Sequence, residues 1–206
     1  MLTCNRLTYN QIKKRFEDAM SHHVVISPEF SANILLVQSG MKPMYYCMEH
    51  PTFTLKQAKT LASLFNDCGI SGKIEPEIIR KTGGQEYHIA FFLTGSNIDT
   101  LFDTYLKDRN AKHKQELWGL MLGYSYPGYS GLSEGLKCVV TIKHSTYERV
   151  ICLQTIPKER LTNFKFIVKQ WRPLFPKSVK IVIHTTDHKQ GPGGSREMFK
   201  KWWLTY

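Results

Sequence analysis

The sequence lacks a long hydrophobic run. No stretch of its 206 residues approaches the roughly 18 consecutive apolar residues that a membrane-spanning helix needs. The N-terminal residues also lack the apolar core of a secretory signal peptide, so we expect a cytoplasmic, reducing location and no membrane span. Glycine (14) and proline (9) are too few for a collagen-like or low-complexity chain. The composition is therefore that of a folded protein.

Cysteine is scarce and irregularly placed. The five cysteines are odd in number, widely spaced, and never form a C-x-x-C motif. This pattern excludes a disulfide framework and indicates free thiols. Cys68, Cys138 and Cys152 lie in apolar segments, where we expect them to pack as small hydrophobic side chains.

Acidic residues are few in the C-terminal third of the chain. Residues 137–206 contain 14 Lys and Arg but only 4 Asp and Glu, a net charge of +10, whereas residues 1–136 contain 14 and 13. Such asymmetry indicates a polyanionic partner, and RNA or single-stranded DNA is the leading prediction. An acidic protein partner and an anionic membrane surface are alternatives, and a basic surface that serves solubility alone is another.

Helical and strand patterns alternate along the chain, which predicts an α/β or α+β fold with a mixed sheet covered by helices and a C-terminal ββαβα unit. A Thr8-x-x-Gln11 capping box starts the first helix, and His88–Leu93 is apolar enough for a strand buried on both faces. The predicted helices are 8–20, 55–68, 98–106, 112–122, 157–172 and 195–204. The predicted strands are 24–26, 34–37, 44–48, 88–93, 138–142, 150–153 and 179–183.

A Gly-, Ser- and Tyr-rich stretch over 123–136 interrupts this pattern, and the charge balance changes just after it. We therefore expect a near-neutral mixed region over 1–122, a loop or linker over 123–136, and a basic region over 137–206. All three could also form one domain.

The helix predicted over 157–172 carries a basic stripe beside its apolar face, formed by Lys158, Lys165, Lys169 and Arg172. Aromatic residues interleave with the basic ones in this part of the chain. They would either stack on bases of a single strand or pack in the core, and they are Phe164, Phe166, Trp171, Phe175, Phe199, Trp202, Trp203 and Tyr206.

Residues 184–196 are a candidate phosphate site. A strand is predicted to end near His184, and Gly193, Gly194, Ser195 and Arg196 follow before a helix. Glycines let the backbone approach a phosphate, and a helix N-terminus offers free N–H groups. The same residues would also form an ordinary strand-to-helix connection with a serine cap.

A phosphoester-processing enzyme, nuclease-like or phosphodiesterase-like, is the alternative function. Its candidate catalytic residues are His144, His184, Asp187 and His188. The pair of motifs at 144–146 and 184–186, each His-x-Thr, resembles the paired H-x-[ST] motifs of two-histidine phosphoesterases, which implies one histidine as general base and one as general acid. The middle residues, Ser145 and Thr185, are polar where that family has apolar ones.

A third prediction is an effector or accessory protein that docks an acidic protein partner on its basic face. No P-loop and no specific metal-ligand spacing occurs in the sequence. We therefore predict no cofactor and no metal.

Overall fold

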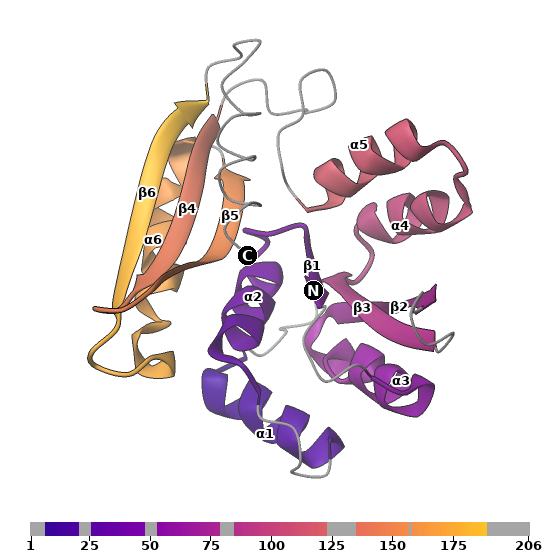
Figure 1. The fold of residues 1–206 in the computed structure, drawn as a ribbon, viewed down its shortest axis with the longest axis horizontal. Helices are drawn as coiled ribbons and strands as arrows, with labels where there is room; N and C mark the ends of the chain where they lie inside the picture. The colour runs from indigo at the N-terminus through magenta and orange to yellow at the C-terminus, as the bar shows by residue number, and fades with distance from the viewer. Residues whose placement is uncertain are drawn as a thin grey trace.

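The computed structural model describes residues 7–20, 26–47, 53–78, 85–122, 135–156 and 158–188 (Figure 1). These residues form six α-helices and six strands, and the strands lie in two three-stranded antiparallel sheets. The predicted α+β class is confirmed. The Gly-rich loop over 123–134 and the predicted final helix lie outside the described residues, so the proposed division of the chain into regions stays a prediction.

The first sheet consists of β1 (Met44–Cys47), β2 (Ile70–Ile78) and β3 (Gln85–Leu93), with β3 in the middle. Alternate side chains of β3 enter two different hydrophobic cores. Ile89 and Phe91 pack on one face of the sheet, and Ala90 and Phe92 pack on the other. The prediction of a strand buried on both faces is thereby confirmed.

Four helices cover this sheet. α1 (Tyr9–Ala19) and α3 (Leu55–Ser63) lie on one face, and α4 (Ile98–Lys107) and α5 (Ala111–Met121) on the other (Figure 1). The Thr8–Gln11 capping box is present in full. α3 ends at Ser63, earlier than predicted, and a short 3₁₀ helix leads to Gly69, whose φ of 75° needs a glycine.

α2 (Pro28–Gln38) corrects the sequence prediction, which placed a strand at 34–37. The Ser27 hydroxyl accepts a hydrogen bond from the Phe30 backbone N–H at 3.1 Å, and Pro28 occupies the first helical position. The helix is buried on several sides because it lies between the two sheets (Figure 1). Its side chains enter both large cores: Phe30, Ile34 and Val37 the first, and Ala32 and Leu36 the second. A helix buried in this way has no amphipathic period, so its apolar run resembles a strand.

The second sheet consists of β4 (Gly135–Lys143), β5 (Glu148–Ile156) and β6 (Lys180–His188), with β4 in the middle. The predicted β4–β5 hairpin with its turn at 144–147 is confirmed, and the turn is closed by a hydrogen bond from the His144 N–H to the Tyr147 carbonyl at 2.8 Å. α6 (Leu161–Lys169) covers one face, where Phe164, Val168 and Trp171 pack with Cys138 of β4. Cys68, Cys138 and Cys152 are buried, as predicted.

β6 is longer than the sequence prediction. The strand was expected to end near residue 183, but it continues to His188, which lies opposite Gly135 of β4. The reason is that β4 is itself nine residues long and offers backbone partners along its whole length. The polar residues 184–188 are therefore part of an edge strand and not of a loop.

Candidate nucleic-acid interface

The predicted basic stripe is partly realised on the outer side of α6. Phe164, Ile167 and Val168 face the core, and Lys165 and Lys169 are exposed on the opposite side. Lys158 is exposed in the 3₁₀ turn that precedes α6. The helical period therefore places the two central lysines in solvent, four residues and about one turn apart.

Arg172 has a different role from the lysines. Its guanidinium donates hydrogen bonds to the carbonyl oxygens of Val179, at 2.8 Å, and Pro176, at 3.1 Å. The side chain thereby closes the turn between the end of α6 and the start of β6. Arg172 thus positions the turn that carries Lys177, and its predicted contact with a partner stays a prediction.

The basic residues of the two halves differ in how they are paired. In the N-terminal half, Arg15 lies 2.5 Å from Asp67, and Lys73 lies 2.6 Å from Asp99. The hydrogen bond from Arg15 lowers the pKa of Asp67, as expected for a carboxylate with a cationic partner.

In the C-terminal half, several exposed cations lie in a stretch of the chain that is poor in acidic residues. Residues 158–183 contain seven Lys and Arg and a single acid, Glu159, and all seven cations are exposed. Among the described residues, none of the ion pairs involves Lys165, Lys169, Lys177 or Lys180. These four lysines therefore contribute positive charge to the surface of the described residues without an ion pair there.

The order of elements gathers several of these cations at one end of the second sheet. β5 runs away from the β4–β5 hairpin, α6 leads back along the sheet, and β6 begins beside the hairpin (Figure 1). Lys169 ends α6, Lys177 follows in the turn, and Lys180 starts β6. Lys180 lies directly opposite Lys143 in the strand register, and only Lys143 has an acidic neighbour, Glu148 at 3.7 Å.

Two like charges directly opposite each other on neighbouring strands destabilise a sheet. The Lys143–Lys180 pair is thus an arrangement that an anion would stabilise. Sequence reasoning missed both residues, because the register that brings them together joins positions 37 residues apart. We call the exposed group of Lys165, Lys169, Lys177 and Lys180 the basic surface.

Most of the described aromatic residues of the C-terminal region are in the core. Phe164, Trp171 and Phe175 are buried, so they cannot stack on a base. Phe166, between the two lysines of α6, is 55% exposed, and Tyr147 at the hairpin turn is 49% exposed. Phe199, Trp202, Trp203 and Tyr206 lie outside the described residues.

The candidate catalytic histidines are not brought together. His144 lies in the hairpin turn, whereas His184 lies in β6 opposite Val139. Lys180 marks the hairpin end of β6, so five strand steps separate the two histidines, about 17 Å along the sheet. Asp187 and His188 follow at the end of the same strand, β6.

The lysines of α6 also lie across the sheet from His184. α6 packs on the face that carries Cys138 and Val140, and His184 shares the opposite face with Val139. The remaining predicted phosphate-site residues, Gly193, Gly194, Ser195 and Arg196, lie outside the described part of the chain.

A titratable cluster that the sequence pattern did not reveal lies on the first sheet. The Tyr46 hydroxyl donates to the Glu75 carboxylate at 2.6 Å and lies 2.9 Å from Nδ1 of His88. The Trp118 ring meets the Tyr46 ring edge to face at 4.5 Å. Tyr46, Glu75 and His88 come from three neighbouring strands, and Nε2 of His88 also lies 3.9 Å from the Glu86 carboxylate. We assign the cluster a structural role, the fixing of Tyr46 beneath α5.

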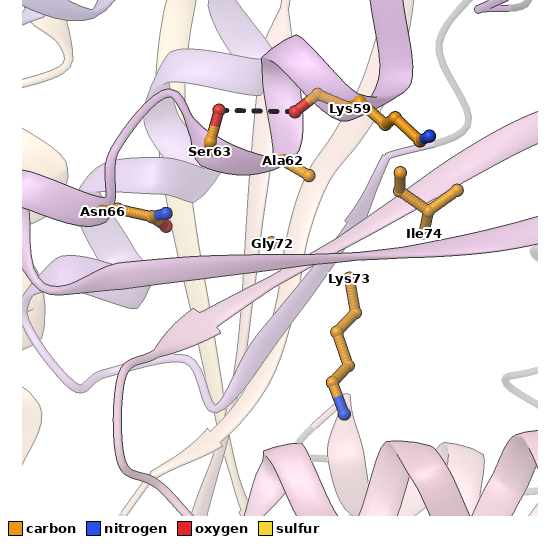
Figure 2. Close-up of a pocket in the computed structure, with 7 residues that line it drawn as sticks. All are labelled: Lys59, Ala62, Ser63, Asn66, Gly72, Lys73 and Ile74. Atoms are coloured by element: carbon orange, nitrogen blue, oxygen red, sulfur yellow. Dashed lines mark hydrogen bonds between the residues drawn. The ribbon is translucent and has the colours of Figure 1, made fainter. Parts of the chain in front are cut away.

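A hollow of about 330 Å³ lies between α3 and β2, and Figure 2 shows its lining: Lys59, Ala62, Ser63, Asn66, Gly72, Lys73 and Ile74. The Lys73 side chain points away from α3 (Figure 2). Its amine contacts Asp99 and Asp103. The Ser63 hydroxyl donates to the carbonyl oxygens of its own helix. The lining therefore offers no pair of free acid–base groups for catalysis.

In the described part of the chain, no three His, Cys, Asp or Glu side chains are placed to hold a metal ion. No helix there is long and apolar enough to cross a bilayer. No protein-family model matches the chain, and no curated protein or solved structure matches it significantly. The fold and its site thus define an α+β protein with an uncompensated basic surface.

Proposed function

We propose that the protein binds nucleic acid through the basic surface formed by Lys165, Lys169, Lys177 and Lys180. The observation that carries this proposal is the contrast in pairing. Arg15 and Lys73 of the N-terminal half have carboxylate partners, whereas the four lysines of the basic surface, which lie in a stretch with a single acid, have no ion pair among the described residues.

A phosphate backbone supplies the missing anions. Phosphates repeat along a strand, so a row of exposed lysines can contact several of them and release their counterions. Phe166 lies exposed between Lys165 and Lys169 and adds an apolar ring beside the charges. Lysines with an interleaved aromatic ring fit a strand with accessible bases better than they fit a purely acidic protein surface.

The salt dependence of binding tests this proposal. With four lysines on phosphates of a single strand, log K should fall with log [salt] with a slope of about −2.8, so affinity should drop about 50-fold from about 50 to 200 mM salt. In Lys165→Gln/Lys169→Gln the slope should fall to about −1.4 and the drop to about 7-fold. Fluorescence anisotropy with a labelled oligonucleotide measures both.

A matched control variant removes two positive charges from a different helix, α3. Lys56 and Lys59 are exposed on α3, three residues apart, and no ion pair of the described residues includes them. Lys56→Gln/Lys59→Gln should keep the wild-type slope. Equal slopes for both double variants would overturn the proposed surface. Failure of the wild-type protein to bind DNA or RNA at low salt would overturn the function, and binding to polyglutamate alone would favour an acidic protein partner.

A further inference from the structure

The tip of the β4–β5 hairpin presents a fixed aromatic ring beside two lysines. The Tyr147 ring stacks on the His144 imidazole with a centroid distance of 5.3 Å and an interplanar angle of 21°. Nδ1 of His144 lies 3.1 Å from the Thr146 hydroxyl and 3.2 Å from the Ser145 hydroxyl, so the imidazole is held within the turn. The tyrosine ring is thus oriented by its own turn, although it is 49% exposed.

Two lysines lie at the same end of the second sheet as this turn. Lys143 is the last residue of β4 before the turn, and Lys180 lies opposite it on β6. Glu148, the first residue of β5, lies 3.7 Å from Lys143, and a single carboxylate neutralises at most one of the two lysines. An exposed flat ring beside a net positive charge matches the two parts of a nucleotide, the base and its phosphate.

The hairpin tip is also continuous with the basic surface. α6 ends at Lys169 and β6 begins at Lys180, and both lie at the hairpin end of the second sheet (Figure 1). Strand alternation places Lys180 and Lys143 on the face of His184, opposite α6, so a nucleic-acid strand bound along α6 would pass Lys177 and turn around the hairpin end of the sheet to reach them.

We infer that Tyr147, supported by His144 and flanked by Lys143 and Lys180, stacks on an unpaired base, and that the protein therefore selects single-stranded over double-stranded nucleic acid. This inference rests on the proposed nucleic-acid binding. The physical reason is that bases within a duplex are stacked on each other and cannot offer a face to the ring, whereas single-strand bases can.

Stacking and charge contacts make separable contributions. Stacking is insensitive to salt, so Tyr147→Ala should weaken single-strand binding about tenfold and leave the salt slope at its wild-type value. Lys143→Gln/Lys180→Gln should instead lower the slope. Tyr147→Phe keeps the ring and should bind within about twofold of wild type. Leu106→Ala, which removes an exposed apolar side chain from α4, is the control and should have no effect.

A fluorescent base reports the contact directly. A single-stranded oligonucleotide that contains 2-aminopurine should lose fluorescence on binding to the wild-type protein and to Tyr147→Phe, and less so on binding to Tyr147→Ala. A duplex of the same sequence should bind the wild-type protein and Tyr147→Ala equally. If the wild-type protein binds single strands but Tyr147→Ala changes neither affinity nor quenching, the inference is wrong and the proposed function stands. If the wild-type protein binds no nucleic acid, both are wrong.

Discussion

Lys42 carries a buried amine at the junction of the two sheets, and its titration should change the stability of the protein. Its side chain is 7% exposed, and Nζ donates to the Asn33 side-chain oxygen at 2.7 Å. The Asn33 amide in turn donates to the carbonyl oxygens of Glu29, at 2.8 Å, and Ile151 of β5, at 3.4 Å. Burial lowers the pKa of Lys42 below its ordinary value of 10.5, and Cys152 opposes this shift only in part.

The sign of the effect follows from proton linkage. Between the lowered pKa of folded Lys42 and 10.5, the unfolded chain holds more protons on this amine than the folded protein does. Stability should therefore rise with pH in that window, by up to about 1.4 kcal/mol per pH unit. Below the folded pKa, the cost of burying the charge is present in full and no longer depends on pH.

Lys42→Met isolates this contribution because methionine has a similar length and no charge. The variant also leaves the Asn33 oxygen without its donor, which costs about 1–3 kcal/mol at every pH. The informative quantity is therefore the slope. Urea unfolding between about pH 6 and 10 measures the free energy of unfolding of both proteins. The difference, wild type minus variant, should increase with pH by up to about 1.4 kcal/mol per pH unit.

The control variant Lys56→Met, on the exposed face of α3, should give no such trend. Parallel curves for wild type and Lys42→Met would refute the reasoning.

Two further substitutions test the packing of α3 and the turn that carries Lys177. A Cβ at Gly72 would lie 2.5 Å from both Cα and the carbonyl oxygen of Ala62, so Gly72→Ala should destabilise by about 1–3 kcal/mol in chemical unfolding. Ala62→Gly should not rescue it, because the contacts are to backbone, and rescue would refute this explanation. Arg172→Gln should lose about 1 kcal/mol of stability with its carbonyl contacts yet keep the wild-type salt slope of oligonucleotide binding, whereas a lower slope would make Arg172 a direct contact.

The elements that the sequence predicted correctly have signals that are local in the chain. The Thr8–Gln11 capping box involves residues three positions apart, and the hairpin turn at 144–147 is closed by residues within the same turn. The strand prediction for β3 likewise depends only on the consecutive apolar residues of the strand itself. Such signals survive folding because few distant contacts compete with them.

The elements that the sequence did not predict depend on distant partners. α2 is helical although its apolar run resembles a strand, because both cores bury it and its hydrogen bonds must be made within the helix. β6 continues to His188 because β4 pairs with it along nine residues, and this places His184 far from His144. Residues 184–188 alone do not indicate that a partner strand is long enough to pair with them.

The sequence by itself determined that the C-terminal third is basic, since net charge depends on composition alone. Which of the cations have partners was decided by the tertiary structure. The Arg15 guanidinium contacts Asp67, which lies 52 residues further along the chain. Lys143 and Lys180, in contrast, are two cations that the strand register places directly opposite each other. Ion pairs need side chains within a few ångströms, and only the packing of helices and strands sets those distances. The basic surface and the exposed Tyr147 ring are therefore products of the fold, built on a charge excess that was already present in the sequence.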